Sequence, residues 1–228
     1  MKKIIKYLFL AFIVFLIVIS LPSNHHKKNN TIKKKEEVTT DINIIDKLKK
    51  EYNNNEIVGT INVENTDINE IIMQSADNDY YLKHDNYGNY DKYGSVFLDY
   101  RCNKDSKKIL IFGHNDYKEE TPFSNLENYY EEDYFKNNQY INIILEDKKM
   151  RYQIFSVYIE TKDFTYMNLK IDDERYRQDL IKYKNKSFYD TNVEVSENDD
   201  ILILQTCSNH KDYKKYKDKY LLIIAKKI

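Results

Sequence analysis

The sequence predicts a mainly β fold: a closed or nearly closed barrel of about eight strands with peripheral helices, preceded by an N-terminal transmembrane helix. Three observations support this prediction. Short alternating or apolar segments bounded by turn-forming residues recur from residue 57 to the end of the chain. Stretches with helical spacing are few and short. A long uncharged segment, residues 7–21, lies near the start.

Residues 1–23 indicate a membrane anchor. Residues 1–6 are basic and residues 7–21 carry no charge. A spanning helix needs about 20 apolar residues, and this run approaches that length if the Lys6 side chain extends to the headgroups. We therefore expect a basic cytoplasmic end and a single spanning helix, with the rest of the chain outside. A cleaved signal peptide is the alternative, although residues 20–23 make a poor cleavage site.

Residues 24–40 are polar and rich in Lys, which predicts a tether rather than a domain. Residues 1–40 carry a net charge of +6, which leaves −7 for residues 41–228. The basic tether either contacts anionic headgroups or is simply solvated. Nothing in this pattern indicates binding to nucleic acid. Residues 41–228 have the length of one domain.

The first half of this domain predicts one helix and several strands. Residues 41–52 place apolar side chains at helical spacing behind a capping Asp. Three strands are expected after this helix, at residues 57–63, 68–74 and 95–100, and the segment 85–94 between the last two is rich in turn-forming and aromatic residues.

The second half predicts further strands and one long insertion. The expected elements are a strand at 108–114, short helices at 122–137, strands at 140–145 and 151–159 joined by a charged turn, a loop at 161–169, a charged helix at 172–184, a strand that ends at Cys207, and a last strand at 220–226. An insertion such as 161–184 either contacts substrate or is a solvated addition.

Two of these strands end on a thiol and an imidazole. The apolar run 201–204 leads to Cys207, and the run that begins at Lys108 leads to His114. A thiol is a strong nucleophile only as the thiolate, and His is its usual base or ion-pair partner, so the pair suggests nucleophilic catalysis. The alternatives are a buried Cys with a satisfied His, or a disulfide between Cys207 and Cys102. His84 and His210 are weaker candidates for the base.

Several motifs resemble those of sortases, and of class B sortases in particular. The segment 204–207, Leu-Gln-Thr-Cys, is similar to the T-L-x-T-C signature, with Ile203 in the place of its first Thr. Residues 112–115, Phe-Gly-His-Asn, are similar to the G-H-N motif that carries the family's histidine. Further segments resemble class B sortases, namely 77–82, 94–101, 154–158 and the helix before the Cys strand. Together they span essentially all of residues 41–228.

The resemblance implies a membrane-anchored cysteine transpeptidase on the surface of a Gram-positive bacterium. Such enzymes cleave an N-P-x-T-x-type sorting motif of surface proteins after its Thr and hold the acyl group as a thioester. They then transfer it to an amine of the peptidoglycan cross-bridge or lipid II. By position, Cys207 is the nucleophile, and His114 is the acid for the leaving amine and the base for the incoming one. The resemblance implies no cofactor and no metal.

The family's catalytic Arg is missing from the last strand. Arg occurs only at positions 101, 151, 175 and 177, and the family position falls on Tyr220, with Lys219 before it. We expect Lys219 to replace the Arg as a cation; the rival is Tyr220 as a single hydrogen-bond donor.

The resemblance also implies that Tyr166, Met167 and Leu82 contact the substrate motif, with ordinary packing as the alternative. Two other interpretations of the whole chain stay open. One is a degenerate sortase that binds sorting motifs with little or no turnover, and the other is a disulfide-bonded, membrane-tethered structural domain. The enzyme interpretation requires Cys102 to be free.

Overall fold

The computed structural model describes residues 44–116, 118–170 and 172–228, which belong to one compact unit. The predicted anchor, the tether and the first residues of the helix predicted at 41–52 lie outside these ranges. None of the helices in the described ranges has the length and apolar character needed to cross a membrane.

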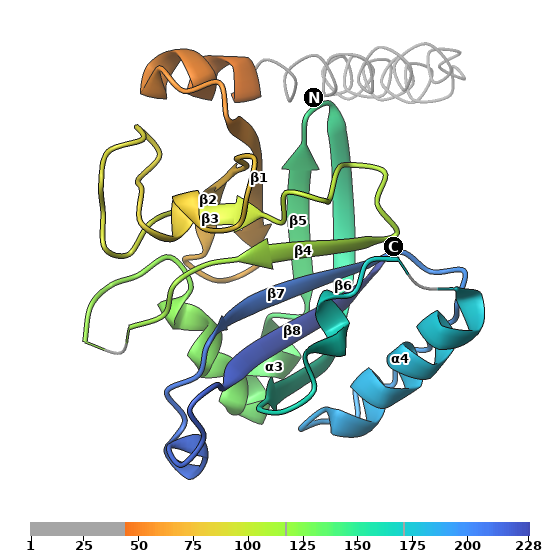
Figure 1. Cartoon of the computed structure of the whole chain (residues 1–228). Coiled ribbons are helices and arrows are strands. Elements are labelled where there is room, and N and C mark those ends of the chain that lie inside the picture. Colours follow the sequence, from red (N-terminus) through yellow and green to blue (C-terminus); the bar gives the residue numbers. More distant parts are fainter. Residues whose placement is uncertain (1–43, 117, 171) are drawn as a thin grey trace, which may run out of the picture. The chain divides into compact units, whose positions relative to one another are not determined.

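The described residues form a closed barrel in the order β1-β2-β3-β4-β7-β8-β6-β5 (Figure 1), as the sequence predicts. The strands are β1 (Ile57–Val63), β2 (Asn69–Met73), β3 (Val96–Leu98), β4 (Lys108–Phe112), β5 (Tyr140–Leu145), β6 (Lys148–Glu160), β7 (Ile201–Cys207) and β8 (Tyr220–Lys227). The strand β6 starts earlier than predicted. Its pairing with β5 begins at Leu145 and Lys148, so the charged turn shortens to Glu146 and Asp147, with Glu146 in the left-handed conformation at φ 53°.

Short helices surround the barrel. Residues 44–52 are helical, followed by η1 (Tyr80–Leu82), η2 (Ser124–Tyr130), α3 (Glu132–Asn137), η3 (Phe164–Met167), α4 (Asp173–Lys186) and η4 (Lys211–Tyr213). The insertion helix α4 follows standard capping rules. The Asp172 carboxylate accepts a hydrogen bond from the Arg175 amide at 2.8 Å, and acidic and basic side chains occupy the first and last turns respectively.

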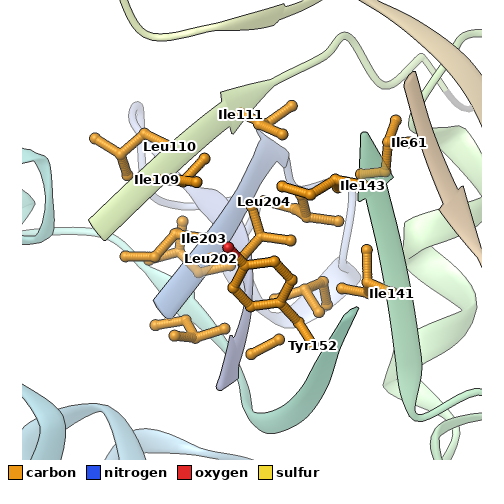
Figure 2. Close-up of a cluster of buried hydrophobic side chains, with 14 of the residues drawn as sticks. Ile61, Ile109, Leu110, Ile111, Ile141, Ile143, Tyr152, Leu202, Ile203 and Leu204 are labelled. Atoms are coloured by element: carbon orange, nitrogen blue, oxygen red, sulfur yellow. The ribbon is translucent and has the colours of Figure 1, made fainter. Parts of the chain in front are cut away.

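Strands β4 and β7 have continuous apolar sequences because their side chains are buried in the core. Side chains of β4, β7 and β8 pack with those of β1, β5 and β6, as Figure 2 shows for Ile109, Leu202 and Ile143. The labelled residues Ile109–Ile111 and Leu202–Leu204 have no exposed surface. Burial of one such side chain contributes about 1.5–3 kcal/mol to the free energy of folding, so β4 and β7 contribute strongly to the stability of the barrel.

Strands β4 and β7 pair in parallel, with Ile111 beside Leu204 and Phe112 beside Gln205. This relationship is not evident from the sequence. Because parallel strands end at the same edge of a sheet, the residues that follow β4 lie beside the end of β7. Two hydrogen bonds continue the contact: the Gly113 amide donates to the Gln205 carbonyl at 3.2 Å, and Thr206 Oγ1 donates to the Gly113 carbonyl at 2.7 Å.

Candidate active site

A cavity of about 280 Å³ opens where β4 and β7 end. It brings together five residues singled out from the sequence, namely Cys207, His114, Leu82, Met167 and Tyr220. Its wall also contains Asn78, Phe97, Phe112, Gly113, Gln205 and Thr206. The cavity thus combines a thiol and an imidazole with a largely apolar wall. Such a site can bind an extended peptide and allow the sulfur to attack a carbonyl carbon of that peptide.

His114 is positioned by a close approach of two chain segments. A Cβ atom on Gly113 would lie 2.7 Å from the ring of Phe123, so only glycine fits there without displacing that ring. The Phe123 amide donates to the His114 carbonyl at 3.0 Å. The ring Nε2 lies 2.9 Å from the Leu82 carbonyl oxygen. Because a carbonyl only accepts, Nε2 carries the proton in this arrangement.

Cys207 is a free thiol at the mouth of the cavity. Although the residue is solvent-exposed, neighbouring atoms partly desolvate the sulfur. This burial raises the pKa of the thiol, while the charge of Lys219 opposes the shift. The thiol is therefore mostly protonated at neutral pH in the absence of substrate.

Cys102 is also free, and it lies buried away from the site. Its sulfur lies 3.5 Å from the Lys108 carbonyl oxygen, and burial raises its pKa to about 11. Neither cysteine forms a disulfide, so the structure contradicts the hypothesis of a disulfide-bonded domain.

A carboxylate holds the backbone around Cys207. Glu127 Oε1 accepts hydrogen bonds from Asn115 Nδ2 at 2.9 Å and from the Asn209 amide at 2.5 Å. Asn115 Nδ2 also donates to the Cys207 carbonyl at 2.8 Å. Glu127 thus connects Asn115, the residue after His114, with the loop that follows Cys207. Sequence reasoning missed Glu127, because nothing in its local pattern distinguishes it from a solvated Glu.

The two candidates for the missing Arg lie in different positions. Tyr220 pairs directly with Cys207 between β7 and β8 and lines the cavity. Lys219 precedes the strand, and its Nζ donates to the Tyr216 carbonyl at 3.5 Å. Burial raises the pKa of the Cys207 thiol, and the charge of the Lys219 ammonium opposes that rise. The tyrosine therefore faces the thiol, and the lysine acts on it through charge.

The three predicted substrate contacts also differ in position. Leu82 and Met167 line the cavity. Tyr166 has no exposed surface, and its hydroxyl donates to Gln205 Oε1 at 2.7 Å. It therefore supports a residue of the wall without lining the cavity itself. Alternating patterns do not apply to the short helix η3, which is why the sequence did not reveal the direction of this side chain.

A candidate metal centre is not found in the described part of the chain. Within residues 44–116, 118–170 and 172–228, no group of three or more His, Cys, Asp or Glu side chains is arranged to hold an ion.

Comparison with known proteins identifies the family. The model of the sortase domain matches residues 61–227. Sortase B of Listeria monocytogenes is 34% identical over 183 residues, which cover 78% of this chain and 74% of that protein. A mutant form of Clostridium perfringens sortase B has a TM-score of 0.75 at 29% identity, covering 86% of this chain and 92% of that chain.

A structure described as a Staphylococcus aureus sortase B–substrate complex has a TM-score of 0.71 at 25% identity, covering 88% of this chain and 98% of that one. The residues that the sortase domain model matches include β7 with Cys207, and β4 with His114 just after its end. The chain therefore belongs to the sortase family and, with sortase B proteins as its relatives, is a cysteine transpeptidase.

Proposed function

We propose that the chain is a class B cell-surface transpeptidase that cleaves an N-P-x-T-x-type sorting motif after its Thr. The acyl part is held as a thioester on Cys207 and passes to an amine of cell-wall peptidoglycan. The observation that carries this proposal is the pairing of β4 with β7, which brings Cys207 and His114 to one cavity. The resemblance of the motifs to class B sortases supports the choice of sorting motif.

In the first half-reaction, the Cys207 sulfur attacks the carbonyl carbon of the Thr and a carbon–sulfur bond forms. The C–N bond then breaks, and protonated His114 donates its proton to the leaving amine. The proton that His114 donates comes from the Cys207 thiol, which passes it to neutral His114 as the sulfur attacks, so the raised pKa of Cys207 is relevant to the rate. Leu82 and Met167 provide apolar surface for the acyl part of the motif.

In the second half-reaction, a cell-wall amine attacks the thioester carbon and gives up a proton to neutral His114. The carbon–sulfur bond breaks, and the proton on His114 passes to the departing sulfur, which regenerates the Cys207 thiol and neutral His114. Both steps pass through a tetrahedral oxyanion. Tyr220 faces the sulfur and can donate one hydrogen bond to this oxygen, and Lys219 contributes positive charge nearby. An apolar wall that limits access of water favours aminolysis over hydrolysis.

One observation favours a second candidate function. The residue opposite Cys207 is Tyr and not Arg, so the site lacks a guanidinium to stabilise the oxyanion. A degenerate sortase that binds the motif with little turnover would have this composition. This candidate shares the cavity and the peptide ligand with the first and differs from it only in rate.

A fluorogenic N-P-x-T-x peptide distinguishes these functions. We expect the purified domain, residues 41–228, to cleave it and to join its acyl part to an added amine. Cys207→Ala should bind the peptide without cleaving it. Binding without cleavage by the unmodified domain supports the degenerate sortase. Equal cleavage by both proteins contradicts the assignment of the nucleophile.

We also propose that residues 1–23 anchor the enzyme in the membrane of a Gram-positive bacterium, with residues 24–40 as the tether. The basic start and the uncharged run that follows support this proposal. Fractionation of cells that express the full chain tests it, because a cleaved and released domain would appear in the medium instead of the membrane.

A further inference from the structure

The segment between β7 and β8, residues 208–219, is strongly basic, and we call it the basic loop. It contains five Lys and two Asp, whereas the domain as a whole carries a net charge of −7. The loop leaves the barrel after Cys207 and returns at Tyr220, two residues that pair with each other and line the catalytic cavity. The Ser208 amide donates to the Lys219 carbonyl at 2.9 Å, so both ends of the loop lie beside the thiol.

Aromatic side chains hold the basic loop against the rest of the domain. The ring centroid of His210 lies 4.7 Å from that of Tyr130 in η2 and 5.6 Å from that of Tyr213. Tyr213 and Tyr216 line a cavity of about 370 Å³ together with Tyr158 of β6. These contacts and the short helix η4 give the loop a defined position next to the barrel.

Three lysines of the basic loop, Lys211, Lys214 and Lys217, are exposed. Within residues 44–116, 118–170 and 172–228, the side chains of these three lysines form no ion pair, hydrogen bond or cation–π contact. The acidic Asp212 lies 3.9 Å from His210 Nδ1 instead of pairing with a lysine. A group of unpaired positive charges on a negatively charged domain attracts anions to this one place.

The basic loop lies next to the segment that carries the proposed base. Glu127 accepts hydrogen bonds from the Asn209 amide in the loop and from Asn115, the residue after His114. The middle of the loop, near Lys214, can lie no more than about 20 Å from the strand ends, because an extended chain spans about 3.3–3.6 Å per residue. A peptide whose amine gives its proton to His114 can therefore reach the lysines with its following residues.

The position of the basic loop in the domain favours a partner in the cell wall over the membrane surface. Figure 1 shows the loop, in blue beyond the ends of β7 and β8, at the opposite end of the domain from the helix at residues 44–52. The proposed tether precedes that helix in the sequence. The acceptor of the second half-reaction is a cell-wall peptide amine, and the anionic groups of a peptide are its carboxylates.

We propose that the basic loop binds carboxylates of the amine acceptor, so that the enzyme prefers acidic peptide amines to neutral ones. This inference rests on the proposed function, because it concerns the acceptor of the second half-reaction. The exposed lysines attract the acceptor and hold it near the thioester, and they take no part in forming or breaking bonds. Electrostatic complementarity of this kind contributes to specificity and to the rate of association.

Two acceptor peptides test the inference in the purified domain, residues 41–228, which forms one compact unit. Both begin with three Gly and end in an amide; one continues with two Glu and the other with two Gln. With saturating motif peptide, we expect kcat/KM for the Glu acceptor to exceed that for the Gln acceptor by about tenfold, the lower end of what electrostatic steering supplies. The ratio should approach one as salt is added, because salt screens the charges.

The triple variant Lys211→Gln, Lys214→Gln, Lys217→Gln removes the three unpaired charges of the basic loop. The ratio of kcat/KM for the two acceptors should fall to about one in this variant. All three side chains are exposed, so we expect the variant to fold with the stability of the wild type.

The matched control is the triple variant Lys47→Gln, Lys49→Gln, Lys50→Gln, which makes the same change in net charge on the helix at residues 44–52. It should keep the wild-type ratio, because these lysines lie at the other end of the domain. In Cys207→Ala, calorimetry measures binding of both acceptors without turnover, and the Glu acceptor should bind more tightly.

Equal kcat/KM and equal affinity for the two acceptors would overturn the inference while leaving the transpeptidase intact. Tighter binding of the Glu acceptor to Cys207→Ala, with no cleavage of the motif peptide by the wild type, would support the inference and contradict the proposed function. Sedimentation with phosphatidylglycerol vesicles, beside neutral phosphatidylcholine vesicles, tests the membrane as the partner. Vesicle binding that the loop variant abolishes, without any advantage for the Glu acceptor, would also overturn the inference.

Discussion

Tyr220 lies directly opposite Cys207 in the antiparallel register of β7 and β8. Side chains at paired positions point to the same face of a sheet, and both residues line the catalytic cavity. Lys219 comes one residue earlier and influences the thiol through its charge. A hydrogen-bond donor and a cation are therefore contributed by two neighbouring residues, where a single Arg is expected from the family resemblance.

This arrangement predicts unequal effects of two substitutions. Tyr220→Phe should lower kcat by about 10²-fold, the loss that follows removal of one oxyanion donor. Lys219→Gln should lower kcat by less than about tenfold. The loss should be smaller at high salt, because salt screens the interaction between the Lys219 charge and the reacting groups. Steady-state kinetics with the motif peptide measures both. A large loss in Lys219→Gln with none in Tyr220→Phe would reverse the assignment.

The raised pKa of Cys207 predicts a particular pH profile for its alkylation. Only the thiolate reacts, so the rate with iodoacetamide should rise through an apparent pKa above the usual value of about 8.5. Lys219→Gln should move the profile to higher pH, since removal of a positive charge disfavours the thiolate. Mass spectrometry measures the rate at each pH.

The same experiment contains its own control. Cys102 is buried and its pKa is raised to about 11, so it should react only after denaturation. A profile for Cys207 centred below about pH 7 would contradict this description, since it would indicate a thiolate–imidazolium pair in the resting enzyme.

Glu127 is predicted to be a positioning residue. Glu127→Ala leaves the amide of Asn209 without its acceptor and removes one of the two acceptors of Asn115 Nδ2, which should destabilise the domain by about 1–3 kcal/mol. The substitution should also lower kcat more than it raises KM, because the segments next to Cys207 and His114 lose the hydrogen bonds to Glu127 that hold them together.

Glu127→Gln is the matched control, because its amide oxygen can still accept these hydrogen bonds. We expect it to recover most of kcat and of the stability measured by denaturant unfolding. If Glu127→Ala and Glu127→Gln both retained wild-type kcat, Glu127 would have no role in orienting the catalytic residues.

Gly113 is predicted to tolerate no side chain. In Gly113→Ala the new methyl group meets the Phe123 ring, so we expect destabilisation of about 1–3 kcal/mol and a loss of activity as His114 shifts. The double variant with Phe123→Leu should recover part of both, since it makes room for the methyl group. Thermal unfolding and peptide cleavage measure these effects. An active, stable Gly113→Ala would show that the close approach does not position His114.

Much of the barrel is predictable from the sequence, because apolar runs such as those ending at Phe112 and Cys207 are long enough to identify buried strands. The pairing of these strands is not predictable in the same way. Their parallel contact depends on the path of the chain over the intervening residues, which a local pattern does not contain. Likewise, the sequence places Tyr220 near the thiol only through the resemblance, whereas the register of β8 places it opposite.

The remaining differences arise where periodicity does not apply. Tyr166 lies in the short helix η3 and turns inward to Gln205, although its neighbour Met167 lines the cavity. Glu127 owes its role to Asn209, which is 82 residues away in the sequence. Contacts of this kind are determined by tertiary packing and become visible only in the folded structure.

The most direct test of the account is intact-mass analysis of the domain after rapid quenching of its reaction with an N-P-x-T-x peptide in the absence of an added amine. We predict an adduct with the mass of the peptide up to its Thr, located on Cys207, released by hydroxylamine and missing from Cys207→Ala. Peptide cleavage that proceeds with no adduct, or with an adduct on another residue, would contradict the role of Cys207 as the acyl carrier.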